Sequence, residues 1–170
     1  MAKRDIRLTP TSYIVLGLIA ATGRATPYDL KRVHQQGIGG FWSLNHAQLY
    51  AEPDRLAGGG YLSVEREEGG RRRKLYELTD RGRDAFSAWL STPTSEFTEL
   101  RDPGLLQLFF GASPGALAGV QRRIHAERLA EYEELQRSAS GWPDGARLVL
   151  ESGIGHEREW LRFWEGVAEG

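Results

Sequence analysis

The sequence predicts a mainly α-helical fold in two parts, with a single β-hairpin inside the first part. Apolar residues recur at helical spacing through most of the 170-residue chain. Residues 61–78 change to the period of strands on either side of a glycine-containing turn. Beyond the segment Thr92-Pro93-Thr94-Ser95, the apolar pattern is again helical. We therefore place a boundary between residues 1–92 and residues 93–170.

The first two helices have recognisable starts and ends. Thr9-Pro10 provides an N-cap hydroxyl followed by proline at the first helical position, and Gly23 ends this helix. Thr26 and Asp29 have the spacing of a capping box, although aspartate is shorter than the usual glutamate. We expect this second helix to end near Gly37.

The third helix begins after either Ser43 or Asn45, both of which can serve as an N-cap. Its inward face should contain Leu49, Pro53 and Leu56. Pro53 removes a backbone hydrogen bond, so either the helix bends there or a new turn starts with this proline. We expect Phe41 and Trp42 to fill the core beneath the preceding loop.

Residues 61–64 are predicted to form a strand, residues 68–70 a turn and residues 74–78 the returning strand. Thr79 then caps a fourth helix. Its apolar side should contain Ala85, Phe86, Trp89 and Leu90. Three helices, a hairpin and a further helix are the element order of a winged helix-turn-helix.

The second part is expected to be an antiparallel helical dimerisation domain. Asp102-Pro103 begins a short helix, Ser113-Pro114 begins a long one to about Ala139, and residues 140–143 precede the last helix. The last helix has an apolar band wider than one packing seam: Val149, Leu150, Ile154, Trp160, Leu161, Phe163, Trp164 and Val167. This band predicts a core completed across a homodimer interface. The alternative is packing onto the N-terminal part.

Charge is distributed unevenly along the chain. Residues 1–92 contain 14 Lys and Arg against 10 Asp and Glu, whereas residues 93–170 contain 8 against 13. The first part should therefore attract phosphate more than the second. The lack of cysteine excludes disulfides and thiolate metal sites and fits a reducing, cytoplasmic setting. The apolar run at 13–21 is shorter than the roughly 20 residues that span a bilayer and fits a signal peptide poorly, so no membrane association is expected.

The third helix carries residue types suited to reading DNA. Four polar side chains should point outward near its N-terminal end: Asn45, His46, Gln48 and Glu52. Asn and Gln can bond bidentately to adenine, and a helix fits the major groove. Tyr50 could reach a phosphate, and Arg55 could do so or pair with Glu52. Since Glu52 and Asp54 should repel phosphate, we expect base contacts before residue 52. The alternative is an ordinary polar helix face.

The predicted hairpin adds a second candidate surface for DNA. The run Arg71-Arg72-Arg73-Lys74 follows the turn directly, and such cations suit phosphate contacts that raise affinity without reading sequence. The alternative is pairing with Glu65, Glu67 and Glu68 across the hairpin. Four consecutive cations exceed what three glutamates require, which favours DNA.

No enzyme signature is found in the sequence. His156-Glu157 begins like a zinc-protease motif, but Trp160 stands where the second histidine belongs. We therefore expect no enzymatic activity, no metal and no cofactor.

Several segments together resemble the PadR family of transcriptional regulators. They are Ile14–Leu18, Ser43–Tyr50, Leu56 with Gly60-Tyr61-Leu62, and Tyr76–Gly82. Leu105–Gly111 and the two long helices resemble the virulence-activator-type C-terminal domain of the larger members. The resemblance spans nearly the whole chain.

The resemblance implies a transcriptional regulator, expected to be a repressor, that binds pseudo-palindromic double-stranded operator DNA as a homodimer. By position, the residues contacting DNA would be Ser43, Asn45, His46, Gln48, Tyr50, Arg71, Arg72, Arg73 and Lys74. A small aromatic effector is also implied, with Trp89, Trp160 and Trp164 as candidate contacts, unless these rings simply fill the core. The alternative function is a ligand- or protein-interaction module on this scaffold without tight DNA binding.

Overall fold

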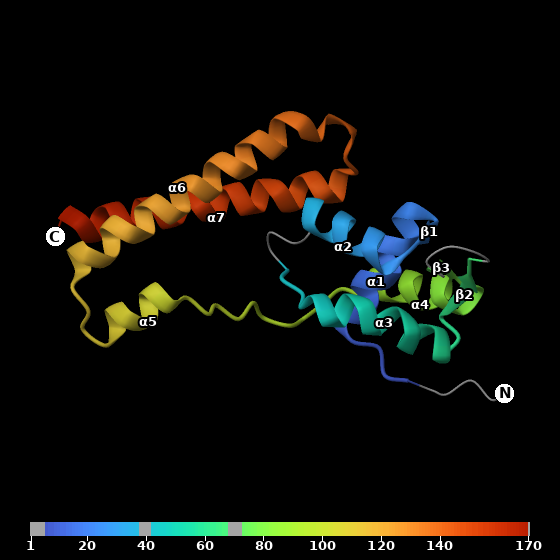
Figure 1. Cartoon of the computed structure of the whole chain (residues 1–170). Helices are drawn as coiled ribbons and strands as arrows, with labels where there is room; N and C mark the ends of the chain where they lie inside the picture. Colours follow the sequence, from blue (N-terminus) through green and yellow to red (C-terminus); the bar gives the residue numbers. More distant parts are fainter. Residues whose placement is uncertain (1–5, 38–41, 68–72, 170) are drawn as a thin grey trace. The chain divides into compact units, whose positions relative to one another are not determined.

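The computed structural model describes residues 6–37, 42–67 and 73–169 and divides the chain into two compact units, Met1–Glu96 and Phe97–Gly170 (Figure 1). The N-terminal unit contains α1 (Pro10–Thr22), β1 (Arg24–Ala25), α2 (Pro27–Gln36), α3 (His46–Gly58), β2 (Leu62–Arg66), β3 (Lys74–Leu78) and α4 (Asp80–Leu90). The C-terminal unit contains α5 (Pro103–Phe109), α6 (Pro114–Ser138), the 3-10 turn η2 (Ala139–Gly141) and α7 (Asp144–Glu169). The predicted mainly α fold with a winged helix-turn-helix is confirmed.

Local side-chain caps fix where the helices of the N-terminal unit begin. Thr9 caps α1 in a capping box with Ser12. The Oδ2 of Asp29 accepts hydrogen bonds from the backbone N (3.0 Å) and the hydroxyl (2.7 Å) of Thr26. These bonds lower the pKa of Asp29. Aspartate therefore completes the capping box of α2, although it is shorter than glutamate. Asn45, rather than Ser43, is the N-cap of α3.

The predicted hairpin forms, and a third strand that the sequence did not indicate completes the sheet. The strand order is β1-β3-β2, with both pairings antiparallel. In the hairpin, Leu78 lies opposite Leu62 and Lys74 opposite Arg66. Gly23, with φ of 76°, ends α1 and lets the chain turn into β1. With only two residues, β1 is too short to show an alternating pattern.

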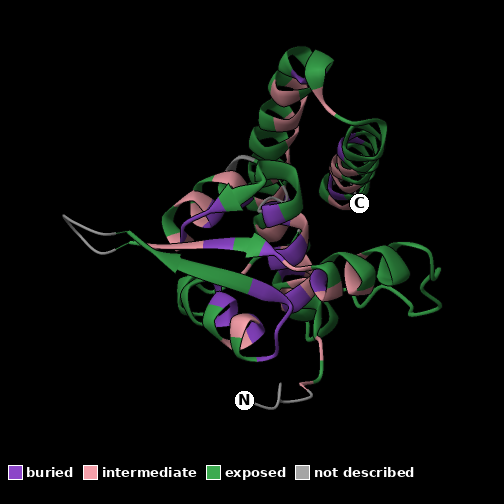
Figure 2. Cartoon of the chain, turned by 90° about the vertical axis from the view of Figure 1, so that its right-hand side faces the viewer, coloured by how far each residue is buried: buried purple, intermediate pink, exposed green. Residues whose placement is uncertain are grey.

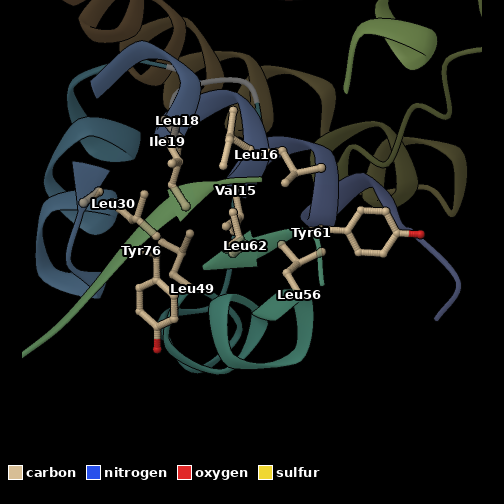
Figure 3. Packing of buried hydrophobic residues seen from close by; sticks show 12 residues of the cluster. Val15, Leu16, Leu18, Ile19, Leu30, Leu49, Leu56, Tyr61, Leu62 and Tyr76 are labelled. Carbon is tan, nitrogen blue, oxygen red and sulfur yellow. The ribbon is translucent and has the colours of Figure 1, made fainter. Parts of the chain in front are cut away.

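The core of the N-terminal unit lies between α1, α2, α3 and the sheet (Figure 3). Its fully buried apolar members are Val15, Leu16, Ile19, Ala25, Leu30, Leu56 and Tyr76. The expectation that Trp42 fills this core is wrong, because its side chain is 45% exposed. Its carbonyl oxygen instead lies 2.9 Å from Nε2 of the buried His34. Phe41 lies outside the described residues, as does the predicted turn at 68–70.

Pro53 lies inside α3, which runs as one helix from His46 to Gly58. No new turn therefore starts at the proline. The pyrrolidine ring is fully buried, so apolar contact offsets part of the cost of the backbone hydrogen bond that proline cannot make.

In the C-terminal unit, α6 and α7 lie side by side as an antiparallel pair (Figure 1). Near the turn between them, Ala139, Leu150 and Ile154 form a small core. α5 packs on α6, where a Cβ added to Gly104 would lie 2.9 Å from Nε2 of Gln121. In the described ranges no helix is long and apolar enough to cross a membrane.

Candidate nucleic-acid interface

The outer face of α3 carries most of the residues predicted to contact DNA. Because Leu49, Pro53 and Leu56 face the core, the opposite face of α3 is turned outward. The exposed side chains there are Asn45, His46, Ala47, Gln48, Tyr50, Ala51 and Asp54. Ser43, just before the helix, is exposed as well. The structure thus brings the candidate residues of the third helix together around its N-terminal end.

Asn45 and Gln48 also hold the start of α3. The backbone N of Ala47 donates to Oδ1 of Asn45 (2.9 Å), and the backbone N of Asn45 donates to Oε1 of Gln48 (3.2 Å). Reading adenine bidentately needs one donor and one acceptor from the side-chain amide. The carbonyl oxygen has two lone pairs, so Gln48 can accept from a base while it stays in the cap.

Glu52 does not point outward as the sequence suggested. Its side chain is only 10% exposed, because it faces α1, where Oε1 accepts a hydrogen bond from the Ser12 hydroxyl (2.7 Å). Arg55 donates to both carboxylate oxygens, at 2.6 and 2.8 Å, and this pairing raises the pKa of Arg55. Since Arg55 balances its charge, Glu52 is a structural residue and not an exposed group that repels phosphate.

Two described cations of the hairpin, Arg73 and Lys74, are engaged in ion pairs. Nε of Arg73 lies 3.0 Å from Oε2 of Glu67, and Nζ of Lys74 lies 2.6 Å from Oδ2 of Asp54 on α3. Cross-strand pairing therefore holds for Arg73, whereas Lys74 joins the hairpin to the helix. Glu65 pairs with Arg24 of β1. The predicted contacts Arg71 and Arg72 lie outside the described residues.

Some exposed residues on these elements were not among the predicted contacts, in particular Ala47, Ala51 and Arg66. Ala47 and Ala51 lie on the outer face of α3, and Arg66 lies on β2 opposite Lys74. Alanine lets a helix approach base edges closely, and its methyl group can contact the thymine methyl. Helical spacing from the inward Leu49 could have identified both alanines.

The three tryptophans proposed as ligand contacts lie in different settings. Trp89 of α4 stacks on Tyr13 at 4.7 Å and is 46% exposed. Trp160 of α7 stacks on His125 at 5.7 Å, and Trp164 is fully buried. Trp160 and Trp164 thus share one helix, while Trp89 belongs to the other unit.

A buried polar pair adjoins Trp160. Nδ1 of His125 lies 2.6 Å from Oε2 of Glu157, with both side chains largely buried. Within the described part of the chain, His125 Nε2 and Trp164 Nε1 are buried without a hydrogen-bond partner. Such atoms are ordinarily satisfied by a water molecule, a ligand or a partner chain. Among the described residues of the chain, no group of three or more His, Cys, Asp or Glu side chains could hold a metal ion.

Comparison with known proteins gives a consistent result. Residues 15–88 match the model of the transcriptional regulator PadR-like family, and residues 100–169 match the virulence activator alpha C-terminal model. The chain is 27% identical to the negative transcriptional regulator PadR of Bacillus subtilis (strain 168), over 91% of this chain and 93% of the relative.

Solved structures show the same fold. The crystal structure of Bacillus subtilis PadR in complex with operator DNA matches with a TM-score of 0.83 and 23% identity, covering 96% of this chain and 99% of that one. The structure of the same regulator with p-coumaric acid matches with a TM-score of 0.78 and 22% identity, covering 93% and 96%.

A hairpin beside the exposed face of α3, followed by a helical unit, defines a winged-helix protein of the transcription-regulator class. The two segments that match family models narrow this class to one family. The chain belongs to the PadR-like family of transcriptional regulators and carries the virulence-activator type of C-terminal region. The resemblance indicated by the sequence is confirmed.

Proposed function

We propose that this protein is a cytoplasmic repressor that binds pseudo-palindromic operator DNA as a homodimer. The observation that carries the proposal is the exposed, polar N-terminal end of α3, a helix that the hairpin contacts through Asp54, in a fold shared with PadR bound to operator DNA. In this proposal α3 enters the major groove and the hairpin contacts the backbone. Residues 1–92 form the DNA-binding domain and residues 93–170 the dimerisation domain.

The proposed residue roles follow from this placement. Asn45, His46 and Gln48 would face base edges, because they lie at the N-terminal end of α3. The remaining contacts would be to phosphates and sugars: Ser43, Tyr50, Arg71, Arg72, Arg73 and Lys74. Phosphate contacts give affinity and orientation, whereas base contacts give sequence preference.

Exposed apolar side chains of the C-terminal unit support the homodimer. They include Phe97, Leu106, Phe109, Phe110, Val120, Ile124, Leu148, Val149 and Phe163. Single exposed apolar residues are normal, but so many in one small helical unit favour an interaction surface. A second copy of the chain would bury these side chains across a symmetric interface.

Light scattering should therefore give twice the 19.0 kDa mass of one chain. Replacing Ile124 of α6 by aspartate should shift the protein towards monomer, because it would bury an unpaired charge. Arg123→Asp, at the neighbouring exposed position, is the control and should leave the dimer intact. A wild-type chain that stays monomeric at every concentration tested contradicts the homodimer.

A small aromatic effector that releases the DNA is the regulatory part of the proposal. It is supported by the structure of Bacillus subtilis PadR in complex with p-coumaric acid. In this chain, Trp160 and Trp164 are the favoured contacts. Trp160 stacks on His125. Among the described residues, Nε2 of His125 and Nε1 of Trp164 are both buried without a hydrogen-bond partner. An aromatic ring could stack there, and an oxygen acceptor could satisfy a buried N–H.

DNA binding is tested by titrating the protein with duplex from its own promoter region at increasing salt. Wild type should bind with a steep salt dependence, because counterions are released at each phosphate contact. The Arg71/Arg72/Arg73→Ala variant should bind more weakly, with the slope of log K against log salt reduced by about 2 to 3. Adding p-coumaric acid should weaken binding of the wild type.

The matched control is Arg137→Ala on α6, which removes an exposed arginine paired with Glu134. It should leave both the affinity and the salt slope unchanged. A wild-type protein that shows no preference for its own promoter duplex even at low salt would support the alternative function, an interaction module without tight DNA binding.

A further inference from the structure

Three side chains join α3 to the hairpin, and we call them the α3–β3 junction: Asp54, Lys74 and Tyr76. Nζ of Lys74 donates to Oδ1 and Oδ2 of Asp54 at 2.8 and 2.6 Å. The hydroxyl of Tyr76 donates to Oδ1 at 2.8 Å. One carboxylate of the helix therefore receives three hydrogen bonds from a single strand 20 or more residues further along the chain.

Tyr76 anchors the β3 side of the junction in the core. Its ring is fully buried, and its backbone pairs with Ala25 of β1 on one side and Val64 of β2 on the other. Figure 3 shows the ring among the core residues with the hydroxyl pointing away from the cluster. Packing in the core thus fixes the Tyr76 hydroxyl, and the hydrogen bond from this hydroxyl fixes the carboxylate of Asp54.

Lys74 ties down the hairpin near its outer end. It belongs to the last paired position of the ladder, opposite Arg66. Burial falls along the hairpin from Leu62 and Leu78 at its base to the exposed Arg66 (Figure 2). A two-stranded ribbon is marginally stable by itself, so a tie to α3 at this position restricts where the outer hairpin can lie.

The charges of the junction are matched within the protein. The hydrogen bond from Lys74 is the main reason why the pKa of Asp54 is lowered, with a further contribution from Tyr76. Burial, followed by the bond to Asp54, raises the pKa of Tyr76. Asp54 is therefore ionised when it meets DNA, and Lys74 compensates its charge.

We propose that Asp54 is a positioning residue for DNA recognition. Through its bonds to Lys74 and Tyr76, it holds the hairpin in a fixed position relative to the outer face of α3. The inference rests on the proposed function. Asp54 then raises the preference for operator over other DNA, although an isolated carboxylate at this place would repel phosphate. Besides the phosphate contact proposed for it, Lys74 contributes to recognition through its bonds to Asp54.

The test compares the full-length wild type with Asp54→Asn, Lys74→Met and the double variant. Affinities are measured for duplex from the protein's own promoter region and for a scrambled duplex of equal length. Each single variant should lower the ratio of the two affinities by roughly tenfold, and the double variant should lower it no further, because all of them break the same junction. Equal tightening of both duplexes by Asp54→Asn would show that Asp54 only repels phosphate, which overturns the proposal.

Hydrogen exchange without DNA examines the junction independently of function. Amides of β3 should exchange faster in Asp54→Asn than in wild type, while those of α1 stay unchanged; unaltered exchange in β3 overturns the junction.

Asp80→Asn, which neutralises a carboxylate that is 92% exposed on α4, is the charge-matched control and should leave the affinity ratio unchanged. A wild type without preference for its promoter duplex contradicts the proposed function. A wild type that has the preference, with an unchanged ratio in Asp54→Asn, contradicts only the junction.

Discussion

Replacing Gly82 by alanine should destabilise the N-terminal unit by about 3 kcal/mol or more. A Cβ at this position would lie 2.1 Å from the carbonyl oxygen of Tyr61, which is backbone and cannot move aside cheaply. The same oxygen accepts a hydrogen bond from the backbone N of Thr79 at 3.1 Å. The hydroxyl of Thr79 donates to the carbonyl oxygen of Gly60 (2.7 Å) and accepts from the backbone N of Gly82 (3.1 Å). The first turn of α4 thus lies directly on the chain entering β2, with no room for a side chain.

Denaturant unfolding followed by circular dichroism measures this effect. The matched control is Gly58→Ala at the end of α3, because a Cβ there meets nothing within 4 Å. Alanine at position 58 should change stability by less than about 1 kcal/mol and could stabilise the helix. If both variants unfold at the wild-type midpoint, the close approach of α4 to Tyr61 is not a constraint on position 82.

Gly82 shows which part of the fold the sequence could not explain. Thr79 was predicted as a helix cap from its immediate neighbours, and the caps at Thr9, Thr26 and Asp102 were confirmed for the same reason. A cap bonds to residues within three positions, so local sequence contains all of its partners. The need for glycine at position 82 arises from Tyr61, which lies 21 positions earlier and meets it only in the folded chain.

The errors at Glu52 and Trp42 have a similar origin. Glu52 looked like an outward acid on a polar helix face, but its partner Ser12 lies 40 residues away on α1. Trp42 looked like a core residue from its chemistry alone, yet the core cluster is formed by other residues, among them Leu30 and Leu49. Periodicity located the outer face of α3 correctly because Leu49 and its helical neighbours define it. It could not show that Asp54 has partners on β3.

Replacing Gln48 by glutamate should separate its role in the capping box from its proposed role in reading bases. Glutamate keeps a carboxylate oxygen to accept from the backbone N of Asn45 and is the usual residue at this place in a capping box. Its charge near the N-terminus of α3 is favourable by about 0.3–1 kcal/mol. The variant should therefore be as stable as wild type in denaturant unfolding. It loses the N–H that would donate to N7 of adenine, and it places a negative charge in the groove.

Binding to promoter duplex should consequently weaken by at least about tenfold, since a bidentate base contact contributes about 1–3 kcal/mol to discrimination. Charge alone would weaken binding to a scrambled duplex as well, so the ratio of the two affinities is the decisive quantity. Asn45→Ser gives a neutral comparison, because serine keeps an oxygen for the cap and loses the amide donor. If Gln48→Glu lowers both affinities equally, Gln48 serves only the capping box. The reading of bases must then lie with other residues on the outer face of α3, such as His46 and Ala47.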